Sequence, residues 1–481
     1  MERRLRRKGS PPWNAGSLTG GRAEGVYTVQ SSGVQANVHL DFSTSRDHPV
    51  IVANVSTSII AVGGQIGYIY EPKYHTSDGS VNAYGALRGI NISKEFMPSV
   101  ANVTGTDLSV YKVVEKNQFA YNCYEGNFKD KGGITPFSNT DIAEVPISEI
   151  PSSTVLVGGF PCQDYSVAST GAAGIHGKKG VLWWEIERIV KSNKMPFILL
   201  ENVDRLLKSP TNQRGRDFGI MLACLNNLGY NVEWRVINAA EYGFVQRRRR
   251  TFIFAYKKTT KYGHSIEKKT ASDIIFDLGL FAKKFPVLAD SSHIKNIKLD
   301  KNIQSVSDTF EFGFENSGLM MNGTIHTTKV IPKEMITTPK LLKDIVLDKV
   351  EEKYFIKESD MHKWEYMKGG KAIERTSKEG FKYIFREGGI AFPDPLYKPA
   401  RTMLTSEGSS NRSTHVIEDI ITKRLRKLSP VECERINGFP DNWTTKFMTD
   451  SQTYFCMGNA LVIPVIKELA DEISLIVDNE F

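Results

Sequence analysis

The sequence has few cysteines and no long apolar run. Its five cysteines are odd in number, lie far apart along the chain and include no Cys-x-x-Cys pair. This pattern indicates neither a disulfide framework nor a zinc site. No apolar stretch approaches the roughly 18 to 20 residues that a membrane-spanning helix needs. We therefore expect a cytoplasmic protein with no membrane association and no metal site.

The chain also lacks internal repeats and low-complexity blocks, and its charge is only mildly unbalanced. Its 62 Lys and Arg residues against 54 Asp and Glu residues give a formal net charge of +8. A basic excess of this size fits a polyanionic partner such as nucleic acid, although proteins that bind no polyanion also show it. The length of 481 residues is sufficient for two or three domains with a large core.

Segments of different character follow one another along the chain. Residues 1–109 hold short β-like pieces between Gly-rich and Asn/Ser-rich turns. Residues 110–260 alternate strand-like apolar runs with helical spacing, which predicts an α/β domain. Residues 261–425 are rich in Lys and turn residues with scattered aromatics, which indicates a smaller, irregular, β-rich domain. Residues 426–481 end in an apolar-periodic helix, 461–477, which opens with Gly458-Asn459-Ala460 and which we expect to pack back on the first domain.

A cysteine stands at a position where α/β proteins place functional residues. The apolar run Thr154–Val157 predicts a buried strand, which breaks at Gly158-Gly159 into a loop that opens with Pro161-Cys162-Gln163. The carboxyl ends of parallel strands are the edge where such sheets bind ligands. A lone cysteine is more often a small core residue than a nucleophile, so the residues around Cys162 must indicate which of the two roles it has.

Two further groups of polar residues are expected at the same edge. The predicted strand 197–200 ends at Glu201, which places a carboxylate near the cysteine. Residues 231–237 and 251–256 are also predicted strands, and Gln246 followed by four consecutive arginines precedes the second. Such a run is usually a solvated basic patch. In an extended chain, however, alternate residues share a face, so Gln246, Arg248 and Arg250 would point together toward Glu201.

Acidic residues near two other predicted strands suit a nucleotide-like cofactor. The predicted strand 110–114 ends at Glu115, the position where such cofactors have their ribose hydroxyls held. A surface glutamate on a turn explains this residue equally well. Asp141, which precedes the next strand, is a candidate for contacting an exocyclic amine of the cofactor.

These motifs together resemble the cytosine-5 DNA methyltransferases, which use S-adenosylmethionine. The matches occur in the family's order and span about residues 110–477. The resemblance implies a catalytic α/β domain with a doubly wound, Rossmann-like sheet, a smaller variable target-recognition domain and a closing C-terminal helix. The matching residues are Glu115 with Asn117, Ala120, Tyr124, Asn127 and Phe128; Gly159 to Gln163; Glu201-Asn202-Val203; Gln246, Arg248 and Arg250; the block from Arg426 to Pro440; and Gly458-Asn459-Ala460.

The resemblance assigns the chemistry to particular side chains. Carbon 5 of cytosine is too weakly nucleophilic to take a methyl group until a nucleophile has added to carbon 6, and a thiolate suits that addition. Cys162 is the expected nucleophile. Glu201 is expected to protonate or hydrogen-bond ring nitrogen 3. Arg248 and Arg250 would hold Glu201 and the carbonyl oxygen of the base, and no metal is needed.

The resemblance also implies how the substrate and the cofactor bind. The target cytosine must be flipped out of double-stranded DNA, and the Gly-rich loop 166–179 would close over it. Cofactor contacts would come from Glu115, Asp141, Pro161, Leu182 and Asn459. The family's first glycine motif is expected about 20 residues before the ribose acid, and residues 91–99 contain no glycine.

The main hypothesis is a monomeric DNA cytosine-5 methyltransferase with a specific recognition sequence, the modification partner of a restriction system. It would be associated with the bacterial nucleoid through DNA. One alternative is cytosine methylation in RNA, although the Cys-Phe-Thr sequence of tRNA-methylating relatives is absent. The other is a DNA-binding homologue without activity, motivated by the missing glycine motif. The recognition sequence itself is not indicated.

Overall fold

The structure is a computed structural model. Backbone and side chains are described for residues 117–127, 141–150, 153–160, 183–210, 212–289, 293–333, 338–376 and 381–480. At Phe128 and Leu182, and at short strands before residue 140, the backbone alone is described. Among those strands, four form one antiparallel sheet: β1 (Ala23–Ser31), β2 (Val34–Thr44), β3 (Pro49–Val55) and β4 (Ile69–Tyr70).

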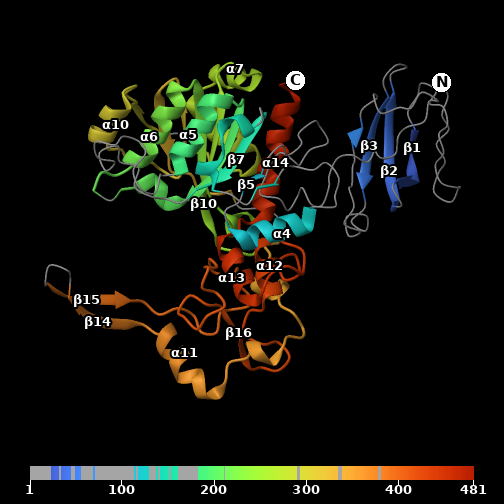
Figure 1. The fold of residues 1–481 in the computed structure, drawn as a ribbon, viewed down its shortest axis with the longest axis vertical. Coiled ribbons are helices and arrows are strands. Elements are labelled where there is room, and N and C mark those ends of the chain that lie inside the picture. The colour runs from blue at the N-terminus through green and yellow to red at the C-terminus, as the bar shows by residue number, and fades with distance from the viewer. Residues whose placement is uncertain are drawn as a thin grey trace.

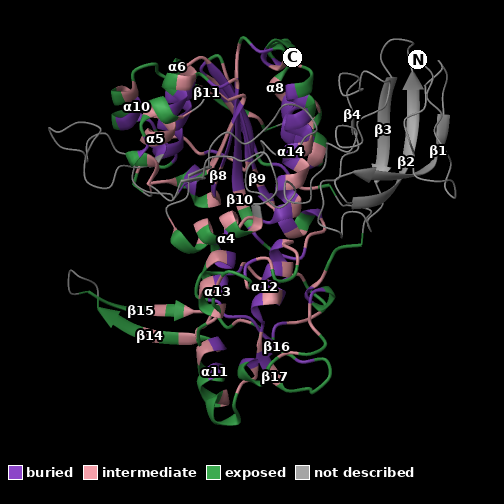
Figure 2. Ribbon diagram, turned by 45° about the vertical axis from the view of Figure 1, so that its right-hand side comes forward, coloured by how far each residue is buried: buried purple, intermediate pink, exposed green. Residues whose placement is uncertain are grey.

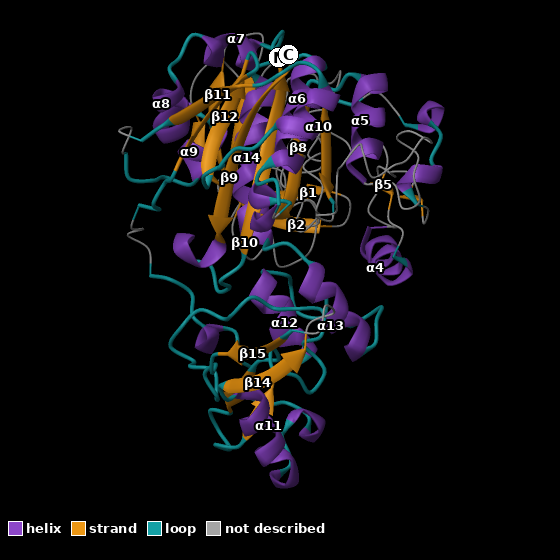
Figure 3. Ribbon diagram, turned by 90° about the vertical axis from the view of Figure 1, so that its left-hand side faces the viewer, coloured by secondary structure: helices purple, strands orange, loops and turns teal. Residues whose placement is uncertain are grey.

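A seven-stranded sheet organises the upper part of the molecule (Figure 3). Its strand order is β11-β13-β12-β9-β10-β8-β7. β7 runs parallel to β8, whereas every other neighbouring pair is antiparallel. The strands are β7 (Val155–Gly159), β8 (Phe197–Val203), β9 (Tyr230–Asn238), β10 (Arg249–Lys257), β11 (Lys295–Lys298), β12 (Ser317–Met321) and β13 (Thr324–Thr328).

The sheet confirms the predicted α/β class but extends further along the chain than expected. The strands predicted at 197–200, 231–237 and 251–256 are β8, β9 and β10. β12 and β13 form a hairpin that pairs with β9 through β12, and β11 pairs with β13. Residues 295–328 therefore belong to this sheet, although the sequence analysis began a second domain at residue 261.

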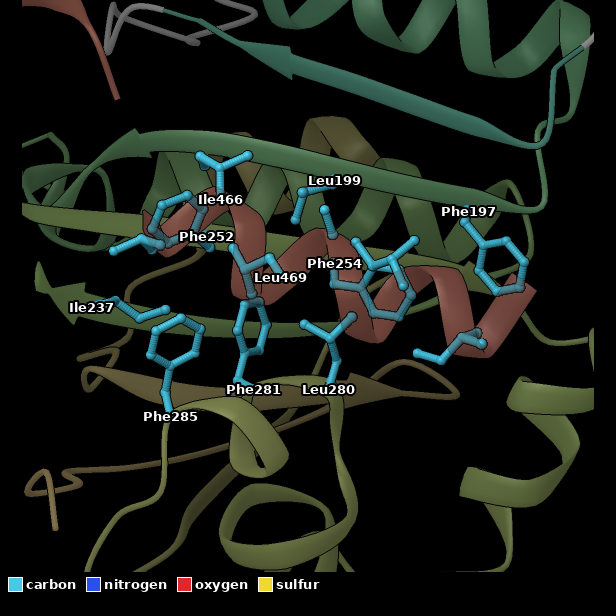
Figure 4. Packing of buried hydrophobic residues seen from close by; sticks show 14 of the residues in the cluster. Phe197, Leu199, Ile237, Phe252, Phe254, Leu280, Phe281, Phe285, Ile466 and Leu469 are labelled. Atoms are coloured by element: carbon cyan, nitrogen blue, oxygen red, sulfur yellow. The ribbon is translucent and has the colours of Figure 1, made fainter. Parts of the chain in front are cut away.

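Alternating residues of the strands build two cores, one on each face of the sheet. Phe197, Leu199, Phe252 and Phe254 lie in one core with helix α14 (Ile463–Asp478), as Figure 4 shows. The short helices α7 (Lys261–Glu267), α8 (Ala271–Asp273) and α9 (Leu280–Lys284) contribute to the same core. The opposite face is covered by α5 (Leu182–Asn193), α6 (Arg216–Asn227) and α10 (Ile303–Thr309).

Burial of both faces follows from the composition of the strands. β8 and β10 are continuous apolar runs rather than alternating ones, as expected for a sheet with helices on both sides. Each fully buried Leu or Phe contributes about 1.5 to 3 kcal/mol relative to an exposed one. The predicted helix 461–477 is confirmed as α14, and it packs on the sheet as expected.

A second lobe lies below the sheet (Figure 1). Its core includes Leu342, Met403, Ile417, Cys433 and Tyr454. In the described part of the chain its regular elements are α11 (Met361–Lys368), β14 (Lys371–Thr376), β15 (Lys382–Glu387), β16 (Val416–Glu418), β17 (Leu425–Lys427), α12 (Pro430–Asn437) and α13 (Asp450–Asn459).

Helix α12 is fixed to β17 by a buried ion network. Ser429 caps the helix in a capping box with Glu432, and Pro430 occupies its first turn. The fully buried Arg426 guanidinium donates to both oxygens of Glu432 at 2.8 Å and to Asp419 at 2.8 Å. The pKa of Asp419 is below its usual value, since hydrogen bonds from the Thr422 backbone and Arg426 outweigh the effect of burial, which would raise it. The network holds the block from Arg426 to Pro440 in place.

No helix within the described ranges is both long and apolar enough to cross a membrane. Three-residue 3-10 turns connect many of the elements, including Ile142–Glu144 before β7. A longer one, Asp204–Lys208, continues directly from β8.

Candidate active site at the carboxyl edge of the sheet

Glu201 and Arg250 form an ion pair near the end of β8. Arg250 lies on β10 opposite Val203, and its Nε is 2.7 Å from Oε1 of Glu201. Both side chains are 17% exposed, so the pair is shielded but reachable. Burial raises the pKa of the Glu201 carboxyl, while the charges of Arg250 and Arg248 lower it in part. The site therefore holds a carboxyl that keeps its proton to higher pH than an exposed glutamate does.

The loop that carries Cys162 begins beside this pair. β7 and β8 are parallel with Gly159 opposite Glu201. A Cβ atom at Gly159 would lie 3.2 Å from Oε2 of Glu201, so a side chain there would crowd the carboxylate. Nδ2 of Asn202 donates to the carbonyl of Phe160 at 2.9 Å and fixes the start of the loop. Pro161 and Cys162 themselves lie outside the described residues.

Gln246 and Arg248 do not share the contact of Arg250 with Glu201. Nη1 and Nη2 of the buried Arg248 donate to the carbonyls of Met403 and Gly458 at 3.3 and 3.1 Å. Burial, together with the neighbouring Arg250 charge, lowers the pKa of Arg248 to about 9, and Glu201 opposes the shift. The side chains expected on one face therefore have different partners. Arg250 contacts the Glu201 carboxyl, and Arg248 connects the sheet to the second lobe.

A buried amide pair extends this connection between the lobes. Nε2 of Gln246 donates to Oδ1 of Asn437 at 2.8 Å, and Oε1 of Gln246 accepts from the backbone of Met403 at 3.2 Å. Nδ2 of Asn437 donates to the carbonyl of Met457 at 3.0 Å. The sequence analysis did not single out Asn437, although it lies within the matched block from Arg426 to Pro440.

The candidates for holding the cofactor's nucleoside follow two parallel strands. β5 (Val113–Val114) pairs with β6 (Phe137–Ser138) in a parallel register. β5 ends at the residue before Glu115, which lies outside the described residues. β6 ends three residues before Asp141, whose carboxylate caps a 3-10 turn by accepting from the Ala143 backbone at 3.1 Å. Two acids that follow neighbouring parallel strands suit the hydroxyls and the amine of a nucleoside.

Helix α4 (Gln118–Phe128) connects this region to the C-terminal motifs. The side chain of Asn117 caps it by accepting from the backbones of Phe119 and Ala120 at 3.0 Å. Asn127 donates to the carbonyl of Trp443 at 3.1 Å, so α4 packs on the segment before α13. Figure 1 shows α4 lying beside α12 and α13.

The remaining predicted cofactor residues lie at helix ends. Leu182 is the first residue of α5. Asn459 is the exposed last residue of α13. Gly458-Asn459-Ala460 was expected to open the C-terminal helix; instead it closes α13, and α14 begins at Ile463. The helix ends there because the backbone of Ala460 is extended, with φ −59° and ψ 153°. One residue earlier, a Cβ at Gly458 would lie 2.3 Å from the Thr405 backbone nitrogen, so two chain segments cross closely at this point.

Within the described ranges, no group of three or more His, Cys, Asp or Glu residues is arranged to hold a metal ion.

A family model described as C-5 cytosine-specific DNA methylase matches residues 101–475. The chain belongs to this family. The match spans β5, the Glu201–Arg250 pair, the second lobe and most of α14, so the predicted DNA cytosine-5 methyltransferase is confirmed.

Two relatives in sequence agree with this assignment. The methylase is 49% identical over 368 residues to the type II methyltransferase M.Sau3AI of Staphylococcus aureus, across 75% of this chain and 87% of that protein. It is 25% identical over 369 residues to the type II methyltransferase M.SsoII of Shigella sonnei, across 76% and 74%. A crystal structure of a mutant DNMT2 from Spodoptera frugiperda gives a TM-score of 0.47 at 13% identity, across 76% of this chain and 92% of that one.

Proposed function

We propose that this methylase transfers a methyl group from S-adenosylmethionine to carbon 5 of a cytosine flipped out of a specific DNA sequence, as the modification enzyme of a restriction system. The names of its relatives, type II methyltransferases, support the restriction context. The observation that carries the proposal is the shielded Glu201–Arg250 pair directly beside the start of the Pro-Cys-Gln loop.

In this proposal the sulfur of Cys162 adds to carbon 6 of the cytosine. The bond formed there moves an electron pair toward ring nitrogen 3, where the protonated carboxyl of Glu201 donates its hydrogen. The raised pKa of Glu201 keeps that proton available. Arg250 orients the carboxyl through its 2.7 Å contact and offers its other N–H groups to the carbonyl oxygen of the base.

Bound S-adenosylmethionine supplies an electrophilic methyl group for carbon 5. Transfer of the proton on that carbon to water then re-forms the carbon 5–carbon 6 double bond and expels the Cys162 sulfur as a thiolate, and ring nitrogen 3 returns its proton to the Glu201 carboxylate. The parallel ends of β5 and β6, with Glu115 and Asp141 after them, fit the nucleoside part of the cofactor. We also propose cofactor contacts from Pro161, Leu182 and Asn459.

For Arg248 we propose a positioning role beside its effect on the Glu201 pKa. Its two hydrogen bonds to Met403 and Gly458 make it a positioning residue that sets the second lobe against the sheet. Since residues 295–328 belong to the catalytic sheet, we place the target-recognition domain after β13. We propose that the enzyme acts as a monomer in the bacterial cytoplasm, associated with the nucleoid through DNA.

One experiment separates the proposed function from its alternatives. The full chain is incubated with methyl-labelled cofactor and with either duplex DNA or tRNA. Label is expected on DNA alone, and bisulfite sequencing of that DNA should reveal one short methylated motif. Label on tRNA alone, or a folded protein that neither binds the cofactor calorimetrically nor labels either substrate, contradicts the proposal.

A further inference from the structure

The hairpin of β14 and β15 stands apart from the rest of the second lobe. Figures 1 and 2 show it projecting sideways from the body of the molecule. The two strands pair only with each other. Their register places Lys371 opposite Glu387 at the base and Arg375 opposite Tyr383 farther out. A two-stranded ribbon of this kind is marginally stable in water unless something packs on it.

The outer part of the ribbon carries large side chains that face solvent. Tyr383 is 47% exposed and Ile384, on the opposite face, is 58% exposed. Phe381, just before β15, is 75% exposed. Apolar groups this exposed on both faces of one element are typical of an interaction surface.

The base of the ribbon, by contrast, is firmly held. The Arg412 guanidinium donates to the carbonyls of Met367 and Gly369 at 3.0 Å and also to that of Gly388. The buried ammonium of Lys368 donates to the Arg412 carbonyl at 2.9 Å. The ribbon is therefore an arm with a fixed direction and an open outer part.

The charge of the arm favours a polyanion. Its strands contain four cationic residues and two carboxylates: Lys371, Arg375, Lys382, Arg386, Glu374 and Glu387. The Arg375 guanidinium lies 4.0 Å from the centre of the Phe385 ring, a cation–π contact along one face of the ribbon. Lys382 contacts Glu374 at 2.9 Å, but with 76% and 64% of these side chains exposed the pair is weak and leaves Lys382 available to a phosphate.

We propose that the ribbon β14–β15 enters the major groove of the DNA duplex beside the flipped base, with Arg375 and Tyr383 facing the base edges and Lys382 and Arg386 facing phosphates. The major groove of B-DNA is wide enough for a two-stranded ribbon, and arginine is the commonest side chain to contact guanine there. The assignment of the two faces follows the register, because directly opposed residues share a face. This inference rests on the proposed function and names the element that gives it sequence specificity.

The first test removes the arm. In the full chain, residues 372–386 are replaced by two glycines, which join Lys371 to its opposed residue Glu387. Because β14 and β15 form a separate two-stranded sheet, we expect unchanged thermal unfolding and unchanged cofactor binding. Methylation of a DNA library with randomised sequence is expected to fall at least tenfold and to lose its preference for one motif. An unchanged motif with an unchanged rate overturns the inference.

Single substitutions remain informative if the shortened chain does not fold. Arg375→Ala should reduce discrimination at one base pair of the motif by about 5- to 150-fold. Lys382→Ala should weaken DNA binding equally for all sequences and reduce the slope of log affinity against log salt by about 1. Lys268→Ala, an exposed charge after α7 at the other end of the molecule, is the matched control and should change neither.

The outcomes also separate this inference from the proposed function. If the wild-type chain methylates DNA but the Arg375 and Lys382 variants retain its motif and salt dependence, only the ribbon assignment is wrong. If the wild-type chain methylates no DNA, the proposed function fails first.

Discussion

Glu201 shows how much of the chemistry depends on the surroundings of a single side chain. Its carboxyl has its pKa raised by burial, yet a cation lies 2.7 Å away. Burial alone would leave a neutral acid without orientation, and a cation alone would keep the carboxylate ionised. The two effects together give an oriented carboxyl whose protonated form persists to higher pH than that of an exposed glutamate.

The first prediction concerns the proton of Glu201. Because the folded pKa is raised, the protonated form persists above the usual value of about 4.3 and is lost as pH rises through the folded value. In Glu201→Gln, kcat/KM should fall by about 10²- to 10⁴-fold, and the part of the decline at high pH that arises from this group should disappear. In Arg250→Met the same decline should move to higher pH, since the carboxyl loses its nearest cation. A pH profile that keeps its shape in both variants would contradict the assignment.

The second prediction concerns Cys162. Cys162→Ser should abolish methyl transfer because a hydroxyl is far less ionised than a thiol, while affinity for duplex DNA should remain close to that of the wild type. DNA with 5-fluorocytosine in the motif traps an adduct, because fluorine cannot leave as the proton does. A denaturation-resistant complex is expected with the wild type alone, and turnover by the serine variant would refute the covalent mechanism.

At the scale of elements, the site depends on how strands and helix ends cross. β7 and β8 place Gly159 beside Glu201 through their parallel register. The end of α13 crosses the segment at Leu404 and Thr405 so closely that Gly458 has no room for a side chain. Arg248 donates to the carbonyl of the same glycine. This crossing at Gly458 therefore positions both the second lobe and Asn459, the next residue in the chain.

The third prediction tests this crossing. In Gly458→Ala the new methyl group would meet backbone atoms at 2.3 to 2.5 Å, so the two segments must separate. We expect a destabilisation of about 1 to 3 kcal/mol, as for overpacking in a core, together with weaker cofactor binding. Gly313→Ala is the control, because nothing lies within 4 Å of its added Cβ. Urea denaturation and calorimetry measure the two effects; equal behaviour of the two variants would argue against the crossing.

At the scale of the whole molecule, the sheet is closed by the end of the chain. α14 packs on residues of β8 and β10 that lie more than 200 positions earlier in the chain, and Leu469 is fully buried there (Figure 4). The C-terminal part of the chain also returns Gly458 and Asn459 to the catalytic edge of the sheet, where Arg248 donates to the Gly458 carbonyl. Stability of the core and assembly of the site are therefore linked.

The fourth prediction measures this closure. Leu469→Ala should lower the free energy of unfolding by about 2 to 5 kcal/mol, since it leaves a cavity between helix and sheet. Leu475→Ala on the same helix removes the same atoms from a side chain that is 55% exposed, and its effect should stay below about 1 kcal/mol. Denaturant titrations of both variants would show equal losses if α14 did not pack on the sheet.

The sequence by itself determined the α/β class, the main strands β8 to β10, the closing helix and the family, because apolar period and motif order are local properties of the chain. It did not determine that Gln246, Arg248 and Arg250 separate toward different partners, or that β11 to β13 extend the catalytic sheet. Those features depend on contacts between residues far apart in the chain, such as Gln246 with Asn437. A buried polar group needs a hydrogen-bond partner, and the packing of distant segments determines which group lies within reach. Only the tertiary structure therefore decides which donor meets which acceptor.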